Sequence, residues 1–185
     1  MSISNFIVVM KDGVLMQQGK PQEVYDNPAN LFVAKFLGTP PINVFAGEVR
    51  GGALYLSGEA VLAVPGAAEG PVTVGIRPEG FAPAAEGPFV CGVNRVEVLG
   101  RDVSIVATRK ACQADTLRVI LRSAKEVDPG AAEVRLALNP EKVFLFAVAT
   151  GARLPVPAPQ PYGGKGHPAR HAIPNRPGST CCRRS

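Results

Sequence analysis

Residues 72–79, which read Val-Thr-Val-Gly-Ile-Arg-Pro-Glu, most constrain what this chain can fold into. Apolar residues alternate there with smaller or polar ones, which is the period-two pattern of a half-buried β-strand. Pro78 ends the strand because it has no amide hydrogen to donate to a neighbouring strand. The pattern therefore predicts that Arg77 and Glu79, opposite charges two residues apart, lie at one edge of a small β domain.

Short apolar stretches separated by turn signals lie on both sides of this strand. Strands are predicted at residues 43–50, 53–57, 60–64, 72–77, 89–98, 102–108, 116–122, 133–138 and 142–147. Many short strands at close spacing predict a mainly β fold, a small barrel or a sandwich. The alternation slips at Asn94-Arg95, which predicts a β-bulge there.

The chain opens with a β-hairpin predicted around an Asp-Gly turn. Two short helices follow. The first begins at Pro21, and the second has Asn27 as its N-cap and Pro28 as its first residue. Phe32 and Phe36 are four apart and share a face of the second helix. This unit is too small to bury its own apolar side chains, so either the β domain covers them or a further domain does.

The last stretch, residues 155–185, contains seven prolines, four glycines and no periodicity, and is predicted to be disordered. It holds five basic residues and no acidic one, which accounts for the whole net charge of +5. The rest of the chain is balanced, so a nucleic-acid-binding face is not expected on the folded part. His167 and His171 lie in this stretch, but Pro168 between them argues against a helical metal site.

The four cysteines form no CxxC pair. Cys91 and Cys112 lie in apolar strand contexts and are expected to be reduced thiols of the core. Cys181 and Cys182 are expected to be free thiols of the tail. The sequence predicts no metal site and no catalytic constellation: Glu97 and Asp102 flank a turn and are expected to be solvated.

Several motifs, taken in order, resemble one family. The segment 7–43 resembles the end of the nucleotide-binding domain in ATP-binding subunits of bacterial ABC importers, of the maltose and sugar-importer type. Residues 75–79 (Gly-Ile-Arg-Pro-Glu) and 96–102 resemble motifs of the regulatory domain that follows it, the TOBE domain. Residues 144–154 resemble the usual end of the family's chain. The resemblance therefore covers roughly residues 3–154, and the order and spacing of the motifs are more specific than any one of them.

This resemblance implies an OB-like small β-barrel of the TOBE type, preceded by a β-hairpin and two short helices. It implies three parts: residues 1–40 as the remnant of the nucleotide-binding domain, 41–154 as the regulatory domain and 155–185 as a basic, Pro-rich tail. In the family, the regulatory domain holds a dimer together and receives regulatory input. By position, Arg77 and Glu79 are then possible contacts to a partner subunit or a regulator; the alternative is a local ion pair.

The departures from the family concern its ATP chemistry. The sequence contains no GxxxxGK[ST] loop, no signature motif and no switch histidine. In the family, the loop cradles the phosphates, the signature motif completes the partner's ATP site, and the histidine lies near the γ-phosphate. We therefore expect no ATP or magnesium, the cofactors of the intact family, to bind to this chain alone. Met1 matches an internal methionine of the family, which favours interpreting the chain as a C-terminal fragment of a transport-coupled ATPase.

The resemblance also implies partners and a location. The intact family works as a pair of ATP-binding subunits with membrane subunits, at the inner face of the cell membrane, in uptake of carbohydrates or related solutes. A second hypothesis is a stand-alone OB-like module that binds a small oxyanion or an oligosaccharide. A third, nucleic-acid binding through the basic tail, ranks lowest.

Overall fold

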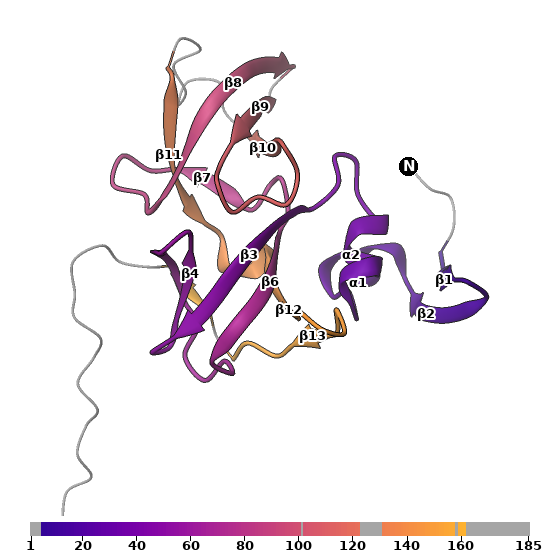
Figure 1. The fold of residues 1–185 in the computed structure, drawn as a ribbon. Helices are drawn as coiled ribbons and strands as arrows, with labels where there is room; N and C mark the ends of the chain where they lie inside the picture. Colours follow the sequence, from indigo (N-terminus) through magenta and orange to yellow (C-terminus); the bar gives the residue numbers. More distant parts are fainter. Residues whose placement is uncertain (1–4, 101, 123–130, 158, 162–185) are drawn as a thin grey trace, which may run out of the picture.

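The computed structural model describes residues 5–100, 102–122, 131–157 and 159–161 (Figure 1). Within these residues the chain is mainly β, with two short α-helices near its start. The first half forms β1 (Ile7–Lys11), β2 (Val14–Gly19), α1 (Pro21–Asp26), α2 (Leu31–Phe36), β3 (Asn43–Arg50), β4 (Ala53–Leu56), β5 (Glu59–Ala63), β6 (Gly70–Ile76) and β7 (Phe81–Pro83). The second half forms β8 (Phe89–Leu99), β9 (Asp102–Thr108), β10 (Leu117–Leu121), β11 (Glu133–Leu138), the 3-10 turn η2 (Pro140–Lys142), β12 (Val143–Ala147), β13 (Arg153–Leu154) and β14 (Gln160–Pro161).

Two antiparallel sheets enclose the main core and make an OB-like, nearly closed barrel. One sheet has the strand order β10-β9-β8-β11-β7, and the other β13-β12-β6-β3-β4-β5-β14. Asn43 joins the sheets: its side-chain amide donates to the Arg118 carbonyl at 2.8 Å, and its Oδ1 accepts from the Arg118 amide at 2.7 Å. Both polar groups of this buried side chain have hydrogen-bond partners, so burying it does not incur the free-energy cost of an unpaired amide.

All nine strands expected from the alternation pattern are confirmed, with ends shifted by a residue or two. The β-bulge is also confirmed, because the pairing of β8 with β9 shifts register between Val93 and Arg95. The hairpin β1–β2 and the two helices are found where they were expected. Three very short strands, β7, β13 and β14, were not predicted, since two or three residues leave too little alternation to detect.

The predicted start of the second helix is wrong. Helix α2 begins at Leu31, and its N-cap is Asn30, whose Oδ1 accepts from the Val33 amide at 2.9 Å. Asn27 instead ends the first helix, where its amide donates to the Glu23 carbonyl. Asparagine is a good N-cap residue, so residue type alone does not distinguish Asn27 from Asn30. A backbone bridge to Ala152 holds Asn30 in the extended conformation of an N-cap, which favours Asn30.

Strand β6 is buried on both faces, not half-buried as its pattern predicted. Its valines and Ile76 belong to the main core, and the face that carries Thr73 and Gly75 is covered as well. A Cβ on Gly75 would lie only 2.8 Å from the Ile42 side chain, so the absence of a side chain at this position lets a second layer pack closely. The strand lies inside its sheet, between β12 and β3.

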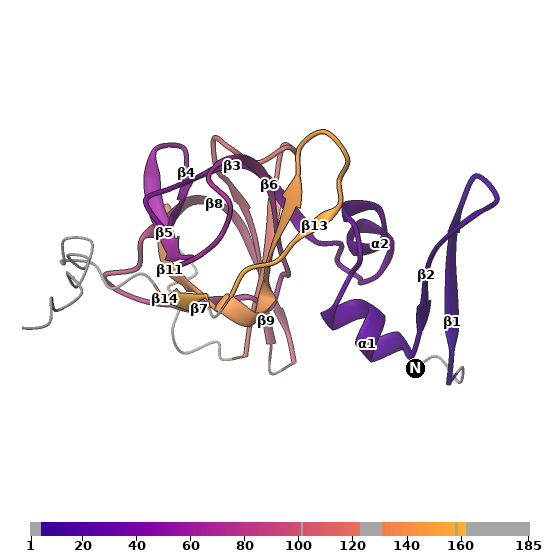
Figure 2. The same cartoon turned by 90° about the horizontal axis from the view of Figure 1, so that it is seen from below.

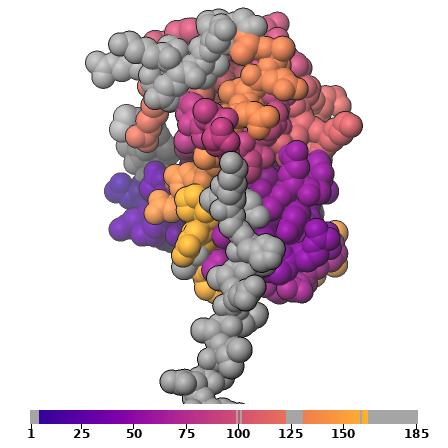
Figure 3. All heavy atoms as spheres, turned by 90° about the vertical axis from the view of Figure 1, so that its left-hand side faces the viewer, coloured from indigo at the N-terminus to yellow at the C-terminus, as the bar shows by residue number. Residues whose placement is uncertain are grey.

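The predicted disorder of the tail is wrong for its first residues. Val156 packs against the main core, and β14 pairs with the edge strand β5, with Gln160 opposite Ala63. An edge strand offers unpaired backbone groups, and a Pro-rich segment favours the extended conformation that can use them. Figure 3 shows this end of the described chain, in yellow, on the surface of the molecule. The rest of the predicted disordered stretch, with its histidines and two cysteines, lies outside the described residues.

The helices lie between the barrel and the hairpin β1–β2 (Figure 2). Ala34 of α2 packs on Ile42, Val44, Phe144 and Phe146 of the barrel, in a second cluster of buried residues. The hairpin packs on the other side of the helices through a third cluster around Val9, Val24 and Val33. The β domain therefore covers one side of the opening unit, as one of the two alternatives predicted.

Other apolar side chains of the opening unit remain more than half exposed. They are Phe6, Val8, Met10, Val14, Leu15 and Phe36. Phe32 and Phe36 stack with ring centroids 6.1 Å apart, which confirms their shared face. Within the described residues, no helix has the length and apolar character needed to cross a bilayer.

Candidate functional site

Arg77 lies at the end of β6, and its side chain is completely buried between the barrel and both helices. Nη1 donates to the carbonyls of Ala34 at 2.9 Å and Leu37 at 2.7 Å. Nη2 donates to the carbonyl of Tyr25 at 2.7 Å. A single side chain of the barrel therefore binds the main chain of α1 and α2; we call these contacts the Arg77 junction.

The junction satisfies carbonyls that a helix cannot satisfy itself. The last carbonyls of any helix lack an intrahelical donor, and they carry the negative end of the helix dipole. The planar guanidinium offers several donors in a fixed fork, so it can serve two helix ends at once. Gly38 leaves room for it: at φ +115° a side chain there would be strained, and its Cβ would lie 3.0 Å from the Tyr25 ring.

Tyr25 covers the junction from the side of α1. The Cζ atom of Arg77 lies 3.8 Å from the centroid of the Tyr25 ring, a cation–π contact. The Tyr25 hydroxyl donates to Oε1 of Glu79 at 2.8 Å. Burial, and then this hydrogen bond to a carboxylate, raise the pKa of Tyr25 to about 12. The phenol therefore stays protonated and keeps its bond to Glu79 at neutral pH.

An ion pair flanks the junction. Nζ of Lys142, in η2, lies 2.7 Å from Oδ1 of Asp26 at the end of α1. Hydrogen bonds from Gln22 and then from Lys142 lower the pKa of the Asp26 carboxyl. Burial lowers the pKa of Arg77, and this effect outweighs the interactions with Tyr25, Glu79 and Asp26, which act in the opposite direction. Hydrogen bonding therefore favours the ionised form of Asp26, whereas burial is the largest influence on the pKa of Arg77.

Main-chain hydrogen bonds attach α2 to the barrel a second time, beside the junction. The Leu31 amide donates to the Gly151 carbonyl at 2.9 Å, and the Arg153 amide donates to the Ala29 carbonyl at 3.1 Å. The Arg153 guanidinium also lies over the Phe144 ring, 4.9 Å from its centroid. Helix α2 is thus held by contacts at both its ends, which makes a rigid connection.

The two site residues predicted from the sequence do not play equal parts. The structure brings Arg77 and Glu79 together around Tyr25, and among the ion pairs of the described residues none joins the two charges directly. The alternative of a local ion pair is therefore wrong. That the two residues contact a subunit or a regulator stays a prediction. Arg77 is buried in contacts within the chain, whereas Glu79 is partly exposed.

Sequence reasoning missed Tyr25, Asp26 and Lys142 as members of the junction. One signal pointed to it: an arginine in an otherwise apolar strand needs several acceptors if it is buried. Two short helices that end before Gly38 could supply those acceptors as free carbonyls. Nothing in the sequence indicated that these carbonyls converge on one side chain.

The described residues contain no cluster of three or more His, Cys, Asp or Glu that could hold a metal ion. Cys91 is buried and Cys112 half-buried, and both are free thiols, as expected. Burial raises the pKa of Cys91 to about 11 and also raises that of Cys112, which favours unreactive thiols. The arrangement has the features of a structural junction: a buried guanidinium holds the ends of two helices through their carbonyls.

Comparison with known proteins finds no matching family model. It does find bacterial relatives. The sn-glycerol-3-phosphate import ATP-binding protein UgpC of Jannaschia sp. (strain CCS1) is 36% identical over 156 residues, which are 83% of this chain and 43% of the relative. The diacetylchitobiose uptake system ATP-binding protein MsiK of Streptomyces coelicolor is 30% identical, over 83% of this chain and 47% of the relative.

The name of a third relative gives a different solute. The Fe(3+) ions import ATP-binding protein FbpC of Photobacterium profundum is 32% identical over 152 residues, which are 78% of this chain and 42% of the relative. The chain thus spans less than half the length of these curated relatives, and it matches their C-terminal portion.

Proposed function

The chain is homologous to the C-terminal part of ATP-binding subunits of bacterial ABC importers, and from this premise we propose that it is the regulatory and dimerisation part of such a subunit. The OB-like barrel would be the TOBE domain, and the hairpin with its two helices would be the end of the nucleotide-binding domain. The names of the relatives include a sugar, a phosphate ester and an iron ion. Because these solutes differ, the comparison supports the role of an importer subunit but does not indicate which solute, a carbohydrate or another, would be transported.

The Arg77 junction is the observation that carries this proposal. It holds the ends of both helices against the barrel through one fully buried side chain. A displacement of the barrel, caused by a regulator or by a second subunit, would therefore move the helices with it instead of bending a flexible linker. A rigid connection of this kind couples the position of the barrel to that of the helices, which is what transmission between two sites requires.

We propose further that these 185 residues alone do not bind or hydrolyse ATP. The sequence holds no glycine-rich phosphate loop with its Lys and Ser/Thr, without which the phosphates and magnesium have no cradle. An ATPase assay on the purified chain tests this point. No magnesium-dependent turnover above background is expected, and turnover that follows the protein through successive purification steps would contradict it.

The partners follow from the family role. They would be a second ATP-binding subunit and the membrane subunits of an importer, which puts the protein at the inner face of the cell membrane, on the cytoplasmic side. Glu79 would be the better placed of the two predicted residues for a contact with a subunit or a regulator, since Arg77 is buried. Cross-linking at position 79 to a co-expressed copy of the chain would test the dimer.

A second candidate is a ligand-binding module that acts without an importer. A solvent-open cavity in the barrel favours it, because small ligands bind in such cavities. Titration of the chain with sugars, molybdate and sulfate distinguishes the two candidates. Saturable binding of one of these ligands, combined with failure to associate with importer subunits, would favour the stand-alone module.

A further inference from the structure

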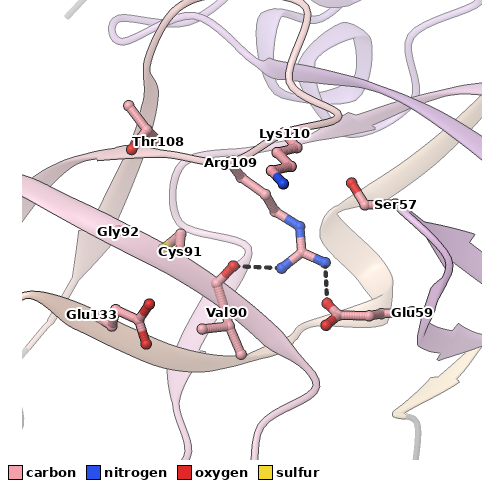
Figure 4. Close-up of a pocket in the computed structure, with 9 residues that line it drawn as sticks. All are labelled: Ser57, Glu59, Val90, Cys91, Gly92, Thr108, Arg109, Lys110 and Glu133. Carbon is pink, nitrogen blue, oxygen red and sulfur yellow. Dashed lines mark hydrogen bonds and ion pairs between the residues drawn. The ribbon is translucent and has the colours of Figure 1, made fainter.

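A cavity of about 500 Å³ opens to solvent on the barrel, away from the Arg77 junction. It lies where β8, β9 and β11 approach the turn between β4 and β5 (Figure 4). Its volume falls within the range of small-molecule sites, and six of its nine lining residues are polar or charged. Neither the junction nor the proposed importer role uses it.

Three adjacent strands form one wall of the cavity. Glu133 of β11 pairs with Gly92 of β8, and Gly92 pairs with Thr108 of β9. Directly opposite residues of antiparallel strands share a face, so the Glu133 and Thr108 side chains stand on the same face, with Gly92 between them. A Cβ on Gly92 would lie 3.3 Å from the Thr108 hydroxyl, so the glycine keeps this space open. The two flanking Cα atoms are then about 10 Å apart, two strand spacings.

A fixed cation forms the middle of the cavity. The Arg109 side chain is only 6% exposed, and its Nη2 lies 2.7 Å from Oε2 of Glu59. Nη1 donates to the Val90 carbonyl, and Cζ lies 4.3 Å from the centroid of the Phe89 ring. These contacts leave Arg109 little freedom, and Glu59 offsets its charge. Arg109 therefore gives the cavity a rigid centre that is close to neutral.

The remaining charges lie at opposite ends. Figure 4 shows Glu133 at one end, with its carboxylate pointing toward the centre, and Lys110 and Ser57 at the other. The three residues are exposed, so a ligand can reach them without unfolding the barrel. A simple anion would meet Lys110 favourably and Glu133 unfavourably, and a simple cation the reverse. Only a ligand with both charges complements both ends.

We propose that this cavity binds a small zwitterion of the ω-amino acid class, whose ammonium lies against Glu133 and whose carboxylate lies at the Lys110 end. The hydroxyl of Ser57, at the Lys110 end, can add a donor for the carboxylate. Arg109 lies between Glu133 and Lys110 in Figure 4, which favours a molecule in which several bonds separate the two groups. This inference does not depend on the importer role, since the cavity belongs to the barrel itself.

Three probes of matched size test the charge pattern: 4-aminobutyrate, butyrate and n-butylamine. Each is titrated into the full, ¹⁵N-labelled chain, and the amide signals of Ser57, Gly92 and Lys110 are followed by NMR. The expected result is saturable shifts with 4-aminobutyrate, at an affinity roughly tenfold higher than that of either singly charged probe, which corresponds to one added charged contact.

Two variants separate the zwitterion from a plain anion. Glu133→Gln should weaken 4-aminobutyrate binding roughly tenfold and at the same time strengthen butyrate binding, because it removes a like charge. Lys110→Gln should weaken both probes. Glu86→Gln, which removes an exposed carboxylate outside the cavity lining, is the matched control and should change neither. Unchanged signals away from the cavity verify that each variant is folded.

Several results would overturn the proposal. One is the absence of saturable shifts with all three probes. A second is butyrate or butylamine binding as tightly as 4-aminobutyrate. A third is a Glu133→Gln variant, folded by its spectrum, that binds all probes like the Glu86→Gln control.

Discussion

Arg77 contacts Tyr25 in two ways at once: its Cζ lies 3.8 Å from the ring centroid, and its Nη2 donates to the Tyr25 carbonyl at 2.7 Å. The ring and the carbonyl belong to the last turn of α1, while the guanidinium belongs to the residue that follows β6. Because Arg77 also binds two carbonyls at the end of α2, the pair defines how the helices sit on the barrel. The mechanical role proposed for the chain depends on this relationship.

Replacing Arg77 should therefore destabilise the helices more than the barrel. Arg77→Met is expected to lower the free energy of unfolding by about 3 kcal/mol, because three carbonyls lose a charged donor. Arg77→Lys should recover only part of this, since one ammonium cannot reproduce the planar fork. Urea unfolding measures the total, and amide hydrogen exchange should show the largest loss of protection in α1 and α2.

Arg95→Met is the control for that experiment. The Arg95 side chain is 73% exposed and, among the residues that the structure describes, pairs only with Glu97 at 3.4 Å, so its loss should cost less than about 1 kcal/mol. Equal free energies of unfolding for the Arg77→Met and Arg95→Met variants would contradict the prediction that the junction holds the helices.

The bond between Tyr25 and Glu79 predicts a loss of stability at high pH. The pKa of Tyr25 is raised from 10.0 to about 12 by burial and by the Glu79 carboxylate. The folded state thus holds the phenolic proton more tightly than the unfolded state. This contribution is complete below pH 10 and disappears as the pH rises through about 12.

Tyr25→Phe isolates this effect, because phenylalanine keeps the ring over Arg77 and cannot titrate. The difference in free energy of unfolding between wild type and variant should be constant up to pH 10 and shrink above it. The tyrosinate absorption band of the folded wild type should include one late-titrating group that the variant lacks. A pH-independent difference in stability would show that Tyr25 titrates as an ordinary tyrosine.

The barrel core should be far more sensitive than the exposed apolar face of the opening unit. Phe89 is completely buried, and its ring lies 5.7 Å from that of Phe45 and 5.1 Å from that of Phe81. Phe89→Ala should cost about 3–5 kcal/mol, the usual range for a buried aromatic side chain. Phe36→Ala removes a ring that is 64% exposed and should cost less than about 1 kcal/mol. A larger loss at Phe36 than at Phe89, measured by urea unfolding, would contradict this placement of the core.

The sequence was sufficient to predict the longer strands and insufficient to predict how they pack. Alternation located β3 to β6 and β8 to β12, and a slip of that alternation located the bulge at Arg95. Alternation reports burial of one face only, so it could not reveal that the second face of β6 is covered by Ile42 and Phe146. It also could not detect β14, whose pairing depends on an exposed edge of β5.

The sequence was enough to single out two residues of the candidate site, but not to predict which residues they contact. Arg77 and Glu79 stood out as charges at the end of an apolar strand, and both belong to the junction. Their partners Tyr25 and Lys142 are 52 and 65 residues away from Arg77 along the chain, so only the folded arrangement brings the three together. Arg77 can be buried because main-chain carbonyls of the helices accept its hydrogen bonds, and the pattern of side chains in a sequence does not show where such carbonyls lie.

The most direct test of the proposed function is transport by a chimeric subunit. In it, this chain replaces the matching C-terminal part of a related importer's ATP-binding subunit, whose own ATP site is kept. We expect the chimera to assemble with the membrane subunits and to support ATP-dependent uptake in reconstituted vesicles, and we expect Arg77→Met to reduce uptake more than ATP hydrolysis. A chimera that folds and hydrolyses ATP but neither assembles nor transports would contradict the account.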